Sequence, residues 1–456
     1  MAKTSRPKMG AHNSREIKPP QLALTEAPPH TSMDVWIQQA EDEYDARKEA
    51  VRRIDAWLKD GDVNAVLNLS SLHLTSLPDP LPAELRWLNA ERNRLACLSN
   101  ALPAELQRLN VECNRLIRLP EILPAGLKTL EASSNQLVCL PHKLPFGLQT
   151  LKVDLNQLTT LDFNLPATLQ TLQVSYNRLT SLTGTLPVGL QTLGAAYNQL
   201  TSLPDELPPG LKTLNVVGNQ LALLPASLPP EIKQLIARYN RLTKLPNSLS
   251  PGLEVLIIDG NRLACLPTTL PVRLKTLEAS YNLLTSLPDN LPPGIQTLIA
   301  SGNRFTSLPD NLPRALKVLD VCGNQLTSLP VSLPEGLKTL SVGSNQLAQL
   351  PANLPAGLRT LVVEDNRLTC LPDKLPIGLK TLVARRNHVT RLPESLLLQP
   401  DLECAVFLED NPLFEQEGTD LAEAISVQGY SGPVVFVSIA AGLQQDGRGE
   451  FPFAFD

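Results

Sequence analysis

Apolar and polar residues follow one another through most of this chain with a period of 21 residues. Each repeat reads close to Gly-Leu-x-x-Leu-x-x-x-x-Asn-x-Leu-x-x-Leu-Pro-x-x-Leu-Pro, and residues 210–229 carry the whole pattern. A fixed period of this length indicates one structural unit that is repeated and stacked. The repeated asparagines are Asn93, Asn114, Asn135, Asn156, Asn177, Asn198, Asn219, Asn240, Asn261, Asn282, Asn303, Asn324, Asn345, Asn366 and Asn387.

The stretch before each asparagine predicts a short strand. Apolar residues alternate there with variable ones, as in Leu88-Asn89-Ala90-Glu91, which is the period of a strand with one buried face. The return leg carries Leu-Pro twice, and proline lacks the N–H that a helix needs and fixes φ near the polyproline II value. This is the leucine-rich-repeat signature. It predicts an α/β solenoid of about 16 short parallel strands with an extended convex side.

The repeated asparagine is interpreted as part of the structure. An amide placed where the chain turns away from a strand can donate to and accept from backbone groups that the turn leaves unpaired. We therefore expect a buried asparagine ladder. Four cysteines stand four residues after such an asparagine, where other repeats have serine, and are interpreted as inert, buried packing. They are Cys97, Cys139, Cys265 and Cys370, while Cys113 and Cys322 fall on the strand face and Cys404 in the terminal repeat.

Composition divides the chain into four parts. Residues 1–30 are polar and Pro-rich, so we expect them to be disordered. Residues 31–62 are expected to form a helical N-terminal cap, and residues 63–413 hold the repeats. Residues 414–456 are expected to be a linker remnant and an irregular tail.

The helical cap is predicted from an apolar face among charged residues, which includes Trp36 and Trp57 and ends at Gly61. A solenoid needs such a cap because its first repeat otherwise exposes its core. Leu72 replaces the asparagine of that first repeat. We therefore expect two short helices that bury both tryptophans against it.

Charge and composition exclude several classes of function. A net charge of -5 gives no global basic field of the kind that gathers nucleic acid. No apolar run approaches the length of a membrane span, and the first residues lack the apolar stretch of a Sec-type signal peptide. Seven cysteines without paired zinc-ligand spacing predict no metal site and a reduced, intracellular place of action. We expect no catalytic site and no cofactor.

Binding residues are sought on outward-facing positions, because the fold does not dictate their identity. Tyrosine combines apolar area with a hydroxyl group at modest entropy cost and is a common interface anchor. It occupies the position before the ladder asparagine at Tyr176, Tyr197, Tyr239 and Tyr281. We predict that this tyrosine column binds a protein. The alternative is that the rings only shield neighbouring backbone.

Charged residues separate along the same face. Acidic residues gather toward the N-terminal end, while basic residues stand at the other end near Glu364 and Asp365. The acidic end either selects a basic partner surface or is a solvated face. The predicted protein-binding residues therefore also include Glu91, Glu112, Glu131, Asp154, Arg238, Arg385 and Arg386.

The helical cap, the Leu-Pro-x-x-Leu-Pro repeats, Arg391-Leu392-Pro393-Glu394-Ser395 and Leu408-Glu409-Asp410-Asn411-Pro412-Leu413 resemble one family. It is the group of bacterial type III secreted effectors that includes IpaH, SspH, SlrP and YopM. The resemblance covers about residues 33–439. It implies an N-terminal secretion signal, delivery into the cytoplasm or nucleus of a host cell, and repeats that bind a host protein.

Residues 429–433, Gly-Tyr-Ser-Gly-Pro, resemble the linker that joins the repeats to a catalytic domain in the ubiquitin-ligase members of this family. Those ligases use a Cys-x-Asp motif, in which an exposed thiolate stands beside a carboxylate. None of the seven cysteines of this chain has that context. The residues after Ile439 match nothing in the family and read as a truncated or frameshifted end.

Three hypotheses follow. The leading one is a non-catalytic effector that binds a host protein on its concave face. The second is the substrate-recognition part of an E3 ubiquitin ligase whose catalytic domain is truncated here. The third is a self-associating scaffold.

Overall fold

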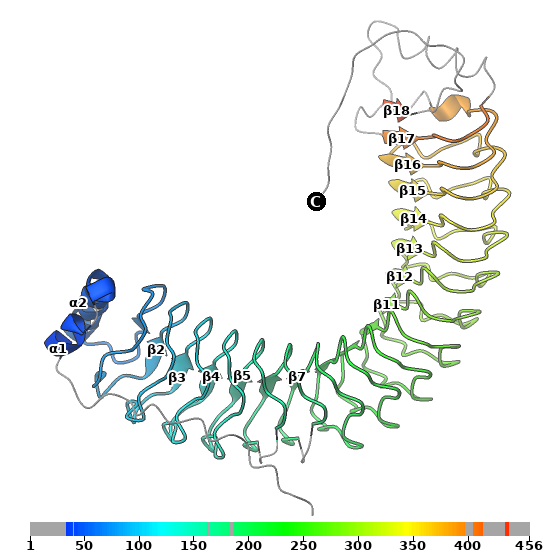
Figure 1. Ribbon diagram of the computed structural model, residues 1–456. Helices are drawn as coiled ribbons and strands as arrows, with labels where there is room; N and C mark the ends of the chain where they lie inside the picture. Colours follow the sequence, from blue (N-terminus) through cyan, green and yellow to red (C-terminus); the bar gives the residue numbers. More distant parts are fainter. Residues whose placement is uncertain are drawn as a thin grey trace, which may run out of the picture.

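The repeats stack into a long, curved solenoid whose strands line the inner side of an arc (Figure 1). The computed structural model describes residues 33–39, 41–161, 165–182, 186–396, 405–413 and 434–436. Each strand pairs in parallel with the next strand in the chain, and all belong to one 18-stranded sheet. The register sets each leucine beside the leucine of the next repeat, as in Leu88 and Leu109. The predicted leucine-rich-repeat solenoid is confirmed.

The strands are two or three residues long. Their bounds are β1 Leu67–Asn68, β2 Trp87–Asn89, β3 Arg108–Asn110, β4 Thr129–Glu131, β5 Thr150–Lys152, β6 Thr171–Gln173, β7 Thr192–Gly194, β8 Thr213–Asn215, β9 Gln234–Ile236, β10 Val255–Ile257, β11 Thr276–Glu278, β12 Thr297–Ile299, β13 Val318–Asp320, β14 Thr339–Ser341, β15 Thr360–Val362, β16 Thr381–Val383, β17 Ala405–Phe407 and β18 Val434–Phe436.

The convex side is extended, as the paired Leu-Pro units predicted. Among the described residues between β1 and β17, the helical segment is the single 3₁₀ turn η2, Glu394–Leu396. Residues 414–456 were expected to be a linker remnant and an irregular tail, and β18 lies within them and pairs with β17. Its sequence, Val-Val-Phe, has the β-branched and aromatic residues that extend a sheet. The other residues of that tail, and residues 1–30, lie outside the described residues.

The asparagine ladder is buried, as predicted, with side chains between 3% and 9% exposed. Asn240 is typical. Its Nδ2 donates to the carbonyl of Val216 in the preceding repeat at 2.8 Å, and its Oδ1 accepts from the N–H of Leu221 at 3.0 Å. In the first repeat the N–H of Leu72 donates to Oδ1 of Asn93, so the ladder begins one repeat late. Each amide thus links two neighbouring repeats.

The N-terminal cap consists of α1 (Met33–Gln38), a short η1 (Glu41–Glu43) and α2 (Tyr44–Asp60). Helix α2 ends at Gly61, whose φ of 70° is the left-handed conformation that glycine adopts without strain. Trp36 is 3% exposed, and the buried Arg47 donates to its carbonyl and lies over its ring. Trp57 is only half-buried. The two predicted helices therefore cover the open end of the first repeat.

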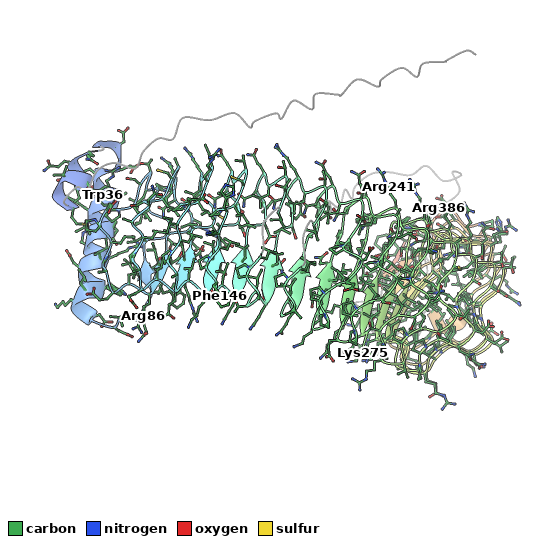
Figure 2. The ribbon with its side chains drawn as sticks, turned by 90° about the horizontal axis from the view of Figure 1, so that it is seen from below. Trp36, Arg86, Phe146, Arg241, Lys275 and Arg386 are labelled. Atoms are coloured by element: carbon green, nitrogen blue, oxygen red, sulfur yellow. The ribbon has the colours of Figure 1, made fainter. Side chains whose placement is uncertain are left out.

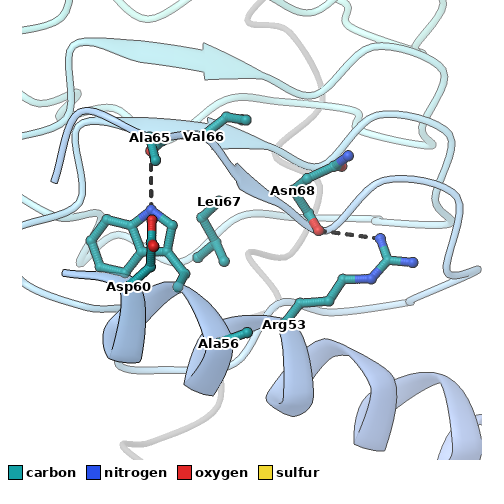
Figure 3. A pocket seen from close by; sticks show the side chains of 8 residues that line it. Arg53, Ala56, Asp60, Ala65, Val66, Leu67 and Asn68 are labelled. Atoms are coloured by element: carbon teal, nitrogen blue, oxygen red, sulfur yellow. Dashed lines mark hydrogen bonds between the residues drawn. The ribbon is translucent and has the colours of Figure 1, made fainter. Parts of the chain in front are cut away.

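A shallow cavity of about 490 Å³ lies between α2 and β1 (Figure 3). Two of its polar side chains already make hydrogen bonds to the backbone. Nε1 of Trp57 donates to the carbonyl of Ala65 at 3.0 Å, and Arg53 donates to the carbonyls of Asn68 and Ser70 at 3.2 and 3.4 Å. These bonds attach the cap to the first repeat and leave the cavity without a converging set of polar groups for a ligand.

The prediction for the four repeated cysteines was wrong. Cys97, Cys139, Cys265 and Cys370 are all exposed. The leucines two and five residues after each ladder asparagine point into the core, as Leu263 and Leu266 do, so the residue between them at the fourth position points out. Solvent contact, and not a need for a small buried side chain, explains why serine and cysteine share this position. Cys404 lies outside the described residues.

Candidate functional site

The inner side of the arc is built from the flanking residues of the strands. The middle leucine of each strand is buried, while the first and third residues of β9 and β10 are half-exposed or exposed. The next residue is buried again, as Ala237 is, and the second residue after the strand, such as Arg238, returns to the surface. This alternation places three variable side chains per repeat on the concave face.

The tyrosine column lies just beyond the strands and not on them. Each tyrosine is the third residue after its strand and has φ between 50° and 54°, in the left-handed region. Gly218, Gly260 and Gly302 take the same position in other repeats. This conformation is uncommon for residues other than glycine and costs roughly 1 kcal/mol or more. Seven of the other repeats also have a residue other than glycine in this conformation, so φ alone does not distinguish the tyrosines from their equivalents.

Each ring leans on the next repeat. A Cβ added to Gly260 would lie 2.5 Å from Cδ1 of Tyr239, so that ring covers the bare backbone of the glycine. Tyr176 and Tyr197 instead stack on one another, with ring centroids 4.5 Å apart. Even so, the exposed fractions of the four tyrosines run from 42% for Tyr197 to 68% for Tyr281. Backbone shielding thus accounts for one side of each ring, and the rest is open to a partner.

The four predicted acidic residues come together over β2 to β5. Burial raises the pKa of Glu112, and the charges of Glu131 and Glu91 raise it further. Burial also raises the pKa of Asp154, whose carboxylate accepts from the N–H of Ser175 at 2.6 Å.

One of these carboxylates already has a basic partner. Oε1 of Glu131 lies 2.5 Å from Nζ of Lys152 in the neighbouring repeat. Lys152 also lowers the pKa of Glu112 and of Asp154. The negative charge at the acidic end is therefore partly neutralised by Lys152.

The predicted arginines are also ion-paired. Arg238 contacts Asp259 at 2.6 Å and also Glu278, two repeats away. At the far end Arg385 contacts Glu409 at 2.8 Å and lies over the ring of Phe407. Arg386 in turn contacts Asp365 at 2.5 Å and Glu364 at 3.7 Å. The separation of charge that the sequence predicted is therefore weaker in the structure, because acid and base neutralise one another across repeats.

The concave face also carries an apolar strip that was not predicted from the sequence. It consists of Val217, Ile236, Ile257 and Ile299, all half-exposed. Ile236 and Ile257 are in register on β9 and β10, and Glu278 separates Ile257 from Ile299. The signal was present in the sequence, because the third strand position is mostly polar elsewhere and is isoleucine in these three repeats.

The apolar strip lies beside the ion cluster of Arg238, Asp259 and Glu278, and the tyrosines Tyr239 and Tyr281 follow the same strands. Protein interfaces typically combine apolar residues at the centre with aromatic rings and with polar groups that already have partners around them. The middle of the arc is therefore the best candidate site.

Nothing in the described parts of the chain supports metal or thiol chemistry. No group of three or more His, Cys, Asp or Glu side chains there is placed to hold a metal ion. Burial raises the pKa of the Cys322 thiol to about 12, so it is not an activated nucleophile. Within the same residues, no helix has the length and apolar character that crossing a bilayer requires.

No family model and no curated protein matches the chain. Among solved structures, YopM from Yersinia enterocolitica is 32% identical, with a TM-score of 0.57 over 84% of this chain and 97% of that one. YopM from Yersinia pestis, described as a leucine-rich effector protein, is 31% identical, with a TM-score of 0.63 over 84% and 99%. A leucine-rich-repeat protein of Leptospira interrogans, 22% identical with a TM-score of 0.58 over 83% and 97%, shares the fold. With these identities over nearly the whole of both YopM chains, the protein belongs to the bacterial leucine-rich-repeat effector family that includes YopM.

Proposed function

We propose that the protein is a type III secreted effector that holds a host protein on its concave face and has no catalytic activity of its own. Membership of the YopM-containing family supports secretion into a host cell. The observation that carries the binding role is the half-exposed apolar strip of Ile236, Ile257 and Ile299, which lies beside ion-paired charges. Stability of the repeats does not require apolar side chains at these positions, because most other repeats have polar residues there.

The site is also preorganised. Every strand is held in register by its neighbours, and Arg238 is fixed between Asp259 and Glu278 before any partner arrives. A partner therefore does not have to order these groups, which lowers the entropic cost of association. Buried aromatic anchors in such interfaces typically contribute about 2 kcal/mol or more each. We expect Tyr239 and Tyr281 to be such anchors, because they stand beside the apolar strip and are the most exposed of the four tyrosines.

The experiment is an affinity capture from host lysate followed by titration of the captured protein against variants of the full chain. One variant carries Ile236→Ser and Ile257→Ser, and a second replaces all four tyrosines by alanine. The matched control is Val331→Ser, which alters an apolar side chain that is 90% exposed on the opposite, convex side. Each site variant should weaken binding at least about thirtyfold, the equivalent of one anchor, while the control binds as the parent does. Equal binding by all variants would move the partner off the concave face.

Ligase activity is the second candidate, favoured by the likeness of residues 429–433 to a ligase linker, although these residues lie outside the described ones. A purified chain mixed with a ubiquitin-charged E2 enzyme should form no thioester. A ubiquitin adduct that reducing agent removes would reject the non-catalytic proposal. Sequencing beyond the codon for Asp456 would establish whether a longer product carries the catalytic domain.

A further inference from the structure

One lateral edge of the solenoid carries a column of basic residues. The column is the seventh residue before each ladder asparagine, and nine of its fifteen members are Lys or Arg, five are Gln and one is Glu254. In Figure 2, Arg86 and Lys275 mark this edge, while Arg241 and Arg386 stand at the opposite one. We call it the lysine edge. The members used here are Lys212, Lys233, Lys317, Lys338 and Arg359, and all five side chains are exposed.

The spacing of these charges is fixed by the backbone. The N–H of Lys338 donates to the carbonyl of Lys317, that of Arg359 to Lys338, and that of Lys380 to Arg359, at 2.7 to 2.8 Å. The cations of Lys317, Lys338 and Arg359 therefore stand on adjacent backbone segments about 4.8 Å apart. Like charges directly beside one another across a sheet destabilise it. The fold gains nothing from this run, so an external anion is the better explanation.

Nearby acids do not cancel the charge. From Lys212 to Arg359, the tenth, ninth and seventh residues before the ladder asparagines include eight basic residues and three acidic ones, Glu231, Glu254 and Glu335. Glu254 is bound to Lys275 at 2.6 Å. Lys212 and Lys317 donate to the neutral amides of glutamines, which leaves their charges in place.

Apolar side chains project from the same edge. Phe146, Val188, Val272 and Ile377 each stand three residues before a member of the column and are 79%, 67%, 66% and 71% exposed. The column members that follow them are Gln149, Gln191, Lys275 and Lys380. Figure 2 shows Phe146 on the side of the solenoid that carries Arg86 and Lys275. A hollow of about 440 Å³ opens between Val272, Lys275 and Gln296. On the opposite edge the exposed apolar residues, such as Leu223 and Leu283, project less, at 48% and 38%.

The shape of the solenoid decides what kind of anion can use the whole edge. The strands follow an arc (Figure 1), and a flat surface meets the convex face of an arc only along one short stretch. It can meet a lateral edge along all repeats at once, over roughly 70 Å at the strand spacing. A nucleic-acid duplex is stiff over such lengths and would follow a curved edge only at a bending cost, so it would engage few repeats.

We propose that the lysine edge docks on the surface of an anionic lipid bilayer, with the lysines and arginines at the headgroups and the projecting apolar side chains at the acyl boundary. Proteins that lie on a membrane without crossing it typically combine basic residues with apolar ones on the surface that faces the lipid. Lysine suits this position, because its long apolar stem can follow the interface while its charge stays in water. The concave face would remain open to its protein partner.

The test is co-sedimentation of the full chain with vesicles of phosphatidylcholine alone, or with one third phosphatidylserine, at low and at high salt. The lysine-edge variant carries Lys212→Gln, Lys233→Gln, Lys338→Gln and Arg359→Gln. Glutamine already occupies this column in five repeats, so the fold should accept it. Each basic residue at an anionic surface contributes about a fivefold factor to partitioning, so the variant should lose at least about twenty-fivefold, which is what two of the four would give.

The matched control carries the same change of charge on the opposite edge, at Arg178→Gln, Arg241→Gln, Arg262→Gln and Arg304→Gln. These arginines are exposed, and their column also alternates with glutamine and lacks acids. The control should bind anionic vesicles within about twofold of the parent chain. A third variant, with Phe146, Val188, Val272 and Ile377 changed to alanine, should lose the part of binding that survives high salt.

Several outcomes would overturn the proposal. The parent chain could fail to bind phosphatidylserine vesicles, or the two charge variants could lose binding equally, which would indicate general electrostatic attraction. Binding to duplex nucleic acid that exceeds vesicle binding, with no effect of the apolar variant, would assign the edge to a different polyanion. None of these results would affect capture of a host protein by the concave face, so the two proposals fail separately.

Discussion

Asn240→Ala tests the physical basis of the whole array. The side chain is 8% exposed and makes four hydrogen bonds. Nδ2 donates to the carbonyls of Val216, Arg238 and Ala237 at 2.8, 3.1 and 3.3 Å, and Oδ1 accepts from the N–H of Leu221 at 3.0 Å. Alanine removes all four while leaving the backbone unchanged.

The free-energy cost of losing these hydrogen bonds differs among the four backbone partners. The carbonyl of Val216 also accepts from Asn219, that of Ala237 from Asn261, and that of Arg238 from the N–H of Gly218. Every carbonyl thus keeps a partner. The N–H of Leu221 does not, and an orphaned buried donor costs about 1 to 3 kcal/mol. With a small cavity added, we expect a loss of about 2 to 4 kcal/mol, concentrated at one interface between repeats.

Hydrogen exchange measures this locally. Protection in peptides that contain Leu221 should fall at least about thirtyfold, the equivalent of 2 kcal/mol, and the urea midpoint of the array should decrease. Repeats near either end should change much less, because each repeat contacts only its neighbours. Asn290→Ala is the control, since that asparagine is exposed on the convex side and makes no side-chain hydrogen bond within the described residues. Unchanged protection in Asn240→Ala, or an equal effect of the control, would refute the ladder as a source of stability.

Three further outcomes follow from the structure. Gly260→Ala should destabilise the protein by about 1 to 3 kcal/mol in thermal unfolding, because φ is 62° and the new Cβ would overlap the ring of Tyr239. Gly210→Ala is the control and should leave stability unchanged, because nothing lies within 4 Å of its new Cβ. Burial raises the pKa of Asp154 in the folded state, so the parent chain should gain stability as pH falls from that raised pKa toward the ordinary value. Asp154→Asn should be more stable than the parent at neutral pH, and its melting curves should lack this pH dependence. Because burial raises the pKa of Cys322 to about 12, iodoacetamide at mildly alkaline pH should label it at least about tenfold more slowly than the exposed Cys265, as followed by mass spectrometry; equal rates would contradict its burial.

The sequence was sufficient for the repeats because their interior is repetitive. A leucine or an asparagine that returns every 21 residues must meet its own copy in the next repeat, so strand, ladder and convex leg follow from one pattern. Val434–Phe436 could not be found this way, since it stands outside the period. The cysteines were misassigned because side-chain size was considered without the direction of the position, which the flanking leucines Leu263 and Leu266 would have indicated.

The site was harder to predict, because its charges choose partners across repeats. Arg238 reaches Glu278, 40 residues away, and Arg386 reaches Asp365, 21 residues away. The period brings such residues near one another, but the choice among several acids depends on side-chain rotamers, which a pattern of residue types does not specify. The apolar strip was missed for a different reason. Only aromatic and charged residues were considered on the concave face.

The tyrosine column also shows that neighbouring repeats are not independent. Tyr197, Tyr239 and Tyr281 are each followed, 21 residues later, by a glycine whose bare backbone the ring covers. A side chain in the next repeat would occupy the space of the ring, so a tyrosine that lies flat requires glycine or a second ring after it. Tyr176 has the second ring and stacks on Tyr197. The spacing of large anchors on this surface is therefore set by the packing of one repeat on the next, and a partner that uses the last three tyrosines meets them at intervals of two repeats, roughly 9.6 Å apart.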